Sequence, residues 1–190
     1  SQVQALSNRE IAAIETADLA AMSTDLIAAL TSSQTGSLTT AQVRALTSSQ
    51  VGAIETGDLT GLRGTQWNAF STDQVRALTT DQISSLRKAQ LTLLSTTAVS
   101  SLTTDQIGAL TASRLQSLTT AQIAALTTDQ LTALSTDQVA GLRSDQVADI
   151  DAAKFAAMTT DQLGAITAGQ AAKLTTSQIV ALDSTHLGAL

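Results

Sequence analysis

The chain has 190 residues, with no cysteine, no proline, no tyrosine and a single histidine. Without cysteine there is no disulfide framework or thiolate metal site, and one histidine leaves zinc, haem and catalytic-triad chemistry without its usual groups. Sixteen acidic residues against ten basic ones give a net charge of -6, which disfavours binding of nucleic acid through a basic face. We therefore expect no cofactor, no metal ion and no nucleic-acid partner.

An eight-residue repeat runs through the whole chain. Positions 6, 14, 22 and so on to 190 hold a large apolar residue at all twenty-four sites. A second register, from position 3 to position 187, is large and apolar at twenty-two of twenty-four sites, with Thr35 and Ala171 as the exceptions. Because no insertion breaks the period, every connection between repeats must be built alike. We expect residues 1–190 to form a single continuous repeat domain, a fragment of a longer array.

The pattern predicts one short helix per octapeptide. In a continuous α-helix an eight-residue period would rotate the apolar pair by about 80° per repeat, so no face would stay dry. Apolar positions three and five residues apart also lack the alternation of a β-strand.

In chain order, the same helix start recurs from Ser7 to Asp183. It consists of Ser, Thr or Asp at eighteen of twenty-three caps and, in most repeats, Gln three residues later, the pattern of a capping box. Asp is frequent at the second helical position, where its charge meets the positive end of the helix dipole. We expect an all-α fold: a tightly wound α-solenoid of about 24 repeats, each with about seven helical residues. The number of helices in one superhelical turn is not predicted by the pattern.

Candidate functional residues are few. Arg63, Trp67, Asn68 and Phe70 lie in the repeat that departs most from the consensus, and they are candidates for binding a protein partner. Trp67 and Phe70 fall in the two apolar registers, so an enlarged core is the competing interpretation. His186 stands where Gln normally completes the capping box. No Ser or Thr has a base arranged beside it in a recognisable motif, and no phosphate-binding loop is present, so we predict no enzyme activity.

The segment Leu126–Leu134 reads LTTDQLTAL, and the variant IETADL at residues 14–19 returns as IETGDL at residues 54–59. These segments resemble the tandem octapeptide (ALTTDQIAAL-type) helical repeat arrays of large bacterial secreted or cell-surface proteins. The resemblance covers the entire chain. It implies an extracellular or cell-surface location in a bacterium and an adhesin-like structural role, and it transfers no functional residue.

From these observations we predict a non-enzymatic structural repeat domain that acts as a rod, stalk or filament segment. Apolar end repeats would favour end-to-end self-association. No run of about 18 apolar residues is present, so no membrane span is expected. The alternatives are a protein- or ligand-binding solenoid scaffold and an ice-binding protein, the latter suggested by thirty-one regularly spaced Thr residues.

Overall fold

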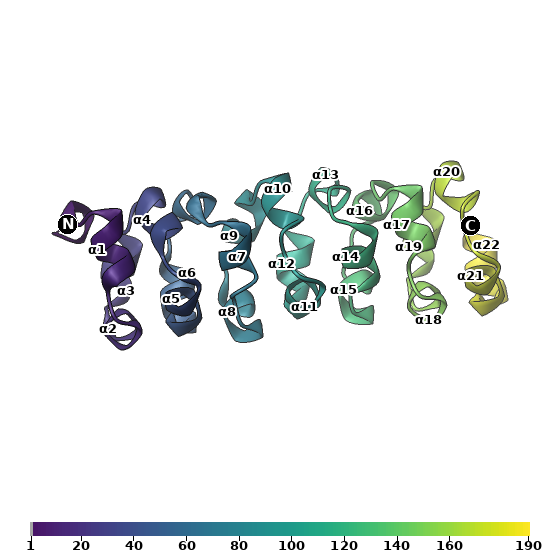
Figure 1. Ribbon diagram of the computed structural model, residues 1–190. Coiled ribbons are helices and arrows are strands. Elements are labelled where there is room, and N and C mark those ends of the chain that lie inside the picture. The colour runs from purple at the N-terminus through teal and green to yellow at the C-terminus, as the bar shows by residue number, and fades with distance from the viewer. Residues whose placement is uncertain (1) are drawn as a thin grey trace. The chain divides into compact units, whose positions relative to one another are not determined.

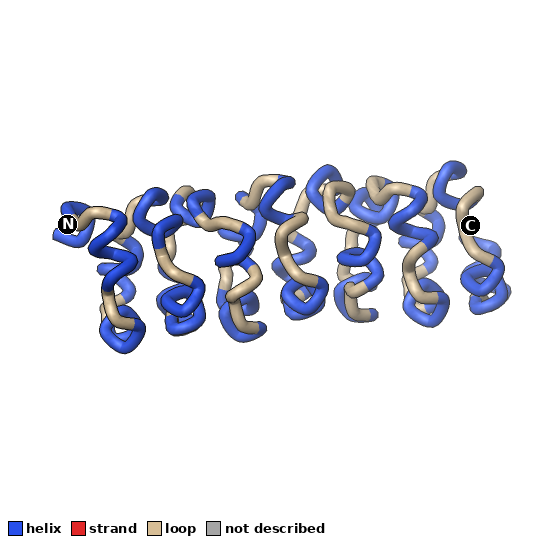
Figure 2. The backbone as a smooth tube through the Cα atoms, in the orientation of Figure 1, coloured by secondary structure: helices blue, strands red, loops and turns tan. Residues whose placement is uncertain are grey.

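A computed structural model describes residues 2–190 of the chain, and throughout this range the secondary structure is helical, with no strand (Figures 1 and 2). The predicted all-α class and the arrangement of one short helix per repeat are confirmed. The chain divides into two compact units, Ser1–Leu102 and Thr103–Leu190, and each is described by itself below.

The helices of the first unit are η1 (Gln2–Ala5), α1 (Asn8–Ala13), α2 (Thr16–Ala21), α3 (Thr24–Ala28), α4 (Ser32–Ser37), α5 (Thr40–Ala45), α6 (Ser48–Ala53), η2 (Asp58–Gly61), α7 (Gly64–Trp67), α8 (Thr72–Ala77), α9 (Thr80–Ser85), α10 (Lys88–Leu91) and α11 (Thr96–Ser101). Those of the second unit are α12 (Thr104–Gly108), α13 (Ala112–Leu115), α14 (Thr120–Ala124), α15 (Thr128–Thr132), α16 (Thr136–Ala140), α17 (Ser144–Ala148), α18 (Ala152–Ala156), α19 (Thr160–Gly164), α20 (Ala168–Ala171), α21 (Thr176–Ala181) and α22 (Ser184–Ala189). The two labels η1 and η2 denote 3-10 helices.

The helices span four to six residues, so the expectation of about seven was too long. The reason lies in the connections. The last residue of one repeat and the cap of the next are both extended: Leu46 has φ -57° and ψ 135°, and Thr47 has φ -71° and ψ 159°. Any L-residue adopts such angles, and no described residue has a positive φ. The connection therefore requires neither glycine nor proline.

Capping boxes start most of the helices. At α5 the Thr39 hydroxyl accepts from the Gln42 amide over 3.1 Å, while the Thr39 amide donates to Gln42 Oε1 over 2.8 Å. Arginine at the cap, as in Arg63 before α7, has no acceptor to offer, so only the glutamine half of the box remains there. The box supplies partners for helix-start amides that would otherwise lack them.

Helices three repeats apart pack against each other. In the first unit α1 packs on α4, α2 on α5 and α3 on α6, and in the second unit α12 packs on α15 and α18 on α21. Between them lie the side chains of the two apolar registers, with Ile11 and Val43 fully buried. No isolated helix of this length is stable in water, so burial of these aliphatic side chains by neighbouring turns is what maintains the helices.

Two glycines allow an unusually close approach between α4 and η2. A Cβ atom on Gly61 would overlap the carbonyl oxygen of Ser32, and one on Gly36 would lie 2.5 Å from the carbonyl oxygen of Gly61. At this pair, the contact is between backbones, and only glycine fits.

A row of buried glutamines joins successive turns, and we call it the glutamine ladder. Its members occupy the third helical position, and their side-chain Nε2 atoms donate to backbone carbonyls 28 and 31 residues earlier. Gln42 donates to Ile14 over 2.8 Å and to Ile11 over 2.9 Å, and in the second unit Gln162 donates to Leu134 and Leu131 over 2.7 Å and 2.9 Å.

Each ladder glutamine therefore serves two helices. Its Oε1 accepts from the cap amide of its own helix, and its Nε2 reaches the carbonyls that end a helix of the preceding turn, which also lack intrahelical partners. Because packing joins repeats 24 residues apart and the ladder joins residues 28 apart, one superhelical turn within each unit takes between three and four repeats. This settles the number that the sequence pattern did not predict.

Candidate functional site

The ladder is interrupted at η2, where Asp58 stands in the glutamine position. The spacing of 28 residues pairs Asp58 with Leu30, just as Gln50 is paired with Met22 one repeat earlier. A carboxylate cannot donate to a carbonyl. The Met22 carbonyl receives Gln50 Nε2 over 2.8 Å, and Asp58 has no such donor to offer to the Leu30 carbonyl. The interruption leaves a place between two turns without its donor.

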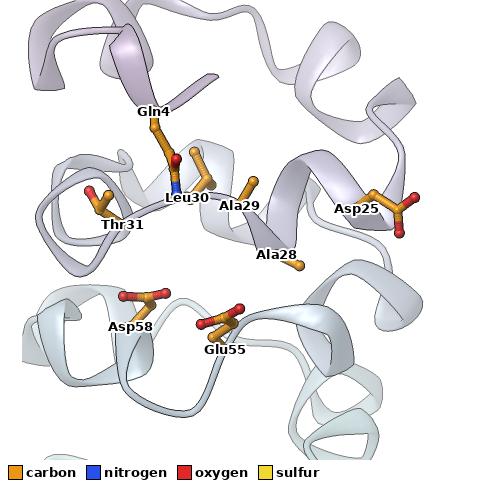
Figure 3. Close-up of a pocket in the computed structure, with 8 residues that line it drawn as sticks. All are labelled: Gln4, Asp25, Ala28, Ala29, Leu30, Thr31, Glu55 and Asp58. Carbon is orange, nitrogen blue, oxygen red and sulfur yellow. The ribbon is translucent and has the colours of Figure 1, made fainter. Parts of the chain in front are cut away.

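A pocket of about 570 Å³ lies at this interruption, and we call it the acidic pocket (Figure 3). The backbone at its wall is the end of α3 and the start of the next repeat, and Figure 3 shows the carboxylates of Glu55 and Asp58 next to each other, facing this segment. Asp25 lies at one end. The lining contains three carboxylates and no Lys, Arg or His: Gln4, Asp25, Ala28, Ala29, Leu30, Thr31, Glu55 and Asp58.

The surroundings of Asp58 oppose ionisation of its carboxyl group. Partial burial raises the pKa of its carboxyl above the ordinary value, the neighbouring Glu55 carboxylate raises it further, and a hydrogen bond from the backbone of Ser32 lowers it. Desolvation and a like charge both oppose ionisation. The acidic pocket thus concentrates negative charge that nothing in its lining neutralises.

Elsewhere in the chain a cation takes the glutamine position. Lys154, at the third helical position of its repeat, donates from Nζ to the carbonyls of Ala124 and Leu126, each over 2.8 Å. The Leu126 carbonyl lies 28 residues earlier, as in the ladder, and the Ala124 carbonyl lies 30 residues earlier, as Ala20 does for Gln50. A primary ammonium group therefore fits between two turns of this fold as well as an amide does.

The four residues predicted to bind a partner do not form one surface. Arg63 and Asn68 are exposed, whereas Trp67 and Phe70 are buried, with ring centroids 5.3 Å apart. Trp67 follows Gln66, whose Nε2 donates to the carbonyl of Thr35 over 3.3 Å. The large indole of Trp67 thus lies in the turn that follows Thr35, one of the two small residues of its apolar register. Partner binding through Arg63 and Asn68 stays a prediction.

Asp183 caps the last helix, and His186 stands at the third helical position, where its amide and ring meet the cap carboxylate. Its amide donates to Asp183 Oδ1 over 2.9 Å, and its Nδ1 lies 3.1 Å from the same oxygen. The amide of His186 and the charge of its ring lower the pKa of Asp183, which supports a capping role. Among the described residues, no three His, Cys, Asp or Glu side chains come together as a metal site.

The fold defines a tandem-repeat protein built of capped octapeptide helices wound into turns. Residues 11–50, 51–88, 108–136 and 120–151 match the ALTTAQ repeat family, and these matches together cover more than half of the chain. The chain belongs to this family, which confirms the predicted tandem array. No curated protein matches it. In the part of the chain that the structure describes, no helix is long and apolar enough to cross a membrane.

Sequence reasoning missed the ladder and, with it, the acidic pocket. One signal was present: a capping box accepts Glu as readily as Gln, yet Gln fills the position in sixteen of twenty-four repeats. Only Gln brings N–H donors in addition to the accepting oxygen. That preference indicates that the side-chain N–H groups have an acceptor of their own. Asp58 has no such N–H group, so it marks a repeat where this hydrogen bond is missing.

Proposed function

We propose that this chain is a non-enzymatic structural repeat module, which acts as a rod, stalk or filament segment of a secreted or cell-surface, adhesin-like bacterial protein. The observation that carries the proposal is the ladder. Fifteen glutamines are buried, and those whose bonds are described join one turn to the next with the same spacing. The buried glutamine side chains form the hydrogen bonds that repeat the same turn-to-turn contact.

Small-angle X-ray scattering of the chain tests the rod. A compact globule of 190 residues has a radius of gyration of about 16 Å. We expect a clearly larger value and a cross-section close to that of one superhelical turn. A value near that of a globule would overturn the rod. The proposed surface location is tested separately, by protease treatment of intact bacterial cells followed by detection of the repeat.

We further propose end-to-end self-association. Ile179, Leu187 and Leu190 belong to the apolar registers but are 38%, 46% and 42% exposed, whereas Ile11 and Leu19 are fully buried. An exposed apolar face of this kind gains free energy when another turn covers it. Light scattering over a hundredfold range of concentration should show growing mass for the parent chain and less for Leu187→Ser. Constant monomer mass would overturn this part.

A second candidate function is a binding scaffold, which is favoured by the exposed Arg63 and Asn68 beside a ladder interruption. Pull-down with the Arg63→Ala, Asn68→Ala double variant against the parent chain tests it, and equal capture of a partner by both would exclude this surface. An ice-binding role stays a prediction that a thermal-hysteresis measurement decides.

A further inference from the structure

The first turn of the chain differs from the later turns at the third helical position, which we call the ladder position. We use the name first turn for residues 7–30, which contain helices α1 to α3 (Figure 1). Its three ladder positions hold Glu10, Asp18 and Leu26, whereas from residue 34 onward two neighbouring ladder positions are never both without glutamine. An ionised carboxylate and an aliphatic side chain have no N–H group. The first turn therefore has no ladder donor for a turn stacked before it.

Burial distinguishes these three residues from the glutamines that follow. Glu10, Asp18 and Leu26 are exposed, whereas Gln34, at the next ladder position, is buried. Gln34 Nε2 donates to the Leu6 carbonyl over 2.8 Å, so ladder bonding begins with the second turn reaching back to the residues before the first.

The helix starts of the first turn do not account for the loss of glutamine. Glu10 Oε2 accepts from the amide and the hydroxyl of Ser7 over 2.7 Å and 2.8 Å, so a carboxylate completes this capping box. At α3 the Ser23 hydroxyl accepts from the Leu26 amide over 3.3 Å, although leucine offers no acceptor in return. These helices form with or without glutamine, and what the replacements remove is the donor towards a preceding turn.

We propose that the first turn is a stop turn, onto which a second copy of this chain does not stack. If a second copy lay before the first turn with the eight-residue period kept, carbonyls of its C-terminal turn would face positions 10, 18 and 26, as the Leu6 carbonyl faces Gln34. Two of these positions would then bury a carboxylate against carbonyl oxygens without a donor, which is strongly unfavourable. A polar outer face of this kind is how repeat arrays commonly end.

The stop turn limits the size of the assembly, a step that rests on the self-association proposed above. Head-to-tail stacking adds copies without end, whereas contact between two identical faces closes at two copies. The C-terminal turn has exposed apolar side chains at Ile179, Val180 and Leu187. We therefore expect two copies to join through their C-terminal turns, which favours a rod or stalk over an open filament.

The experiment restores the donors of the first turn and measures the mass of the full chain by light scattering over a hundredfold range of concentration. The variant combines Glu10→Gln, Asp18→Gln and Leu26→Gln. It should stack head to tail and reach at least about twice the mass of the parent, which should level off at two copies. Because Leu26→Gln removes an exposed apolar side chain, added hydrophobicity cannot explain such growth.

The matched control combines Glu10→Asn, Asp18→Asn and Leu26→Asn. It makes the same change in charge and polarity, but each side chain is one methylene shorter and cannot accept from the cap amide and reach a neighbouring turn at once. Asparagine stands at none of the twenty-four ladder positions. The mass of the control should follow that of the parent. Circular dichroism confirms that each variant is folded, and Glu10→Gln alone, which keeps its acceptor for Ser7, should show a smaller rise in mass.

Two outcomes would overturn the stop turn: a parent chain whose mass rises past two copies, and equal masses for the glutamine and asparagine variants. A parent that stays monomeric while the glutamine variant grows would support the stop turn and exclude self-association through the C-terminal turn. The two proposals therefore fail in different ways.

Discussion

Two repeats depart from the ladder in opposite directions, one around η2 and one around α18. In the first, Asp58 replaces glutamine and cannot donate to the facing carbonyl of Leu30, which lines a pocket. In the second, Lys154 replaces glutamine and still reaches the carbonyls of Ala124 and Leu126. The two repeats share a consensus and a fold. Their difference teaches that an ammonium can replace the amide as a ladder donor and that a carboxylate cannot, although the turns still pack closely at η2, where Gly36 and Gly61 meet.

The largest change in the free energy of unfolding is expected when Lys154 in the α18 repeat is replaced by a carboxylate, as at Asp58 in the η2 repeat. Lys154→Glu removes two charge-assisted hydrogen bonds and places a carboxylate against carbonyls, which should lower the free energy of unfolding by about 3 kcal/mol. Lys154→Gln restores an amide donor and should cost less than about 1 kcal/mol. Urea denaturation of both variants measures this. Equal loss in the two would show that an amide cannot replace the ammonium at these carbonyls.

The next effect concerns the close packing of η2 on α4. Gly61→Ala forces a methyl group onto the Ser32 carbonyl oxygen, and we expect a loss of about 2–3 kcal/mol from overpacking against backbone. Gly57→Ala, in the same repeat, meets no atom within 4 Å, and its φ of -64° suits alanine. That control should be neutral or stabilising by about 0.5 kcal/mol. If the two variants melt at the same temperature, the close contact between α4 and η2 is not present in solution.

A smaller effect, of opposite sign, is expected from repairing the interruption. Asp58→Gln should complete the ladder at η2, with Oε1 accepting from the amide of residue 55 and Nε2 donating to Leu30. One net hydrogen bond contributes about 1 kcal/mol. Thermal and urea denaturation should therefore show stabilisation relative to the parent chain and to Asp161→Asn, which makes the same change in net charge at an exposed position of the second unit. A loss of stability would mean that the pocket geometry cannot accept a ladder glutamine.

The sequence predicts the local structure of this fold and says little about its long-range contacts. Caps such as Thr39 and Gln42, and apolar registers such as Ile11 and Val43, follow from interactions within one repeat, and the structure places them as expected. The angle between successive helices depends on two extended residues at each connection, and their exact torsions leave no mark on the octapeptide pattern. Without that angle, the residue that faces Asp58 across the turn cannot be identified. The pairing with Leu30, and the pocket beside it, therefore came only with the structure.

The smallest expected effect is a change in the pH dependence of the free energy of unfolding, which should come from Asp58 in the η2 repeat. The pKa of Asp58 is raised in the folded chain, first by burial and then by Glu55. Well above its folded-state pKa this carboxyl is ionised in both states, and the folded state bears the repulsion. As the pH falls, the folded chain binds a proton at Asp58 before the unfolded chain does. The Asp58 carboxyl therefore destabilises the folded state less in acid than at neutral pH.

Other carboxyls act in the opposite direction. The pKa of Glu10 is lowered by hydrogen bonds from Ser7, and that of Asp145 by its hydrogen bond from Arg143, so the stability that they contribute is lost in acid. Both groups are present in the parent chain and in Asp58→Gln, and their contribution cancels in the difference between the two. The advantage of Asp58→Gln over the parent should therefore narrow as the pH falls from neutral into the acid range where Asp58 binds its proton, as measured by urea denaturation at each pH. A constant advantage would show that Asp58 titrates as an ordinary exposed carboxyl, and one that widens in acid would show that its pKa is lowered in the folded chain; either result would contradict the crowding of its charge.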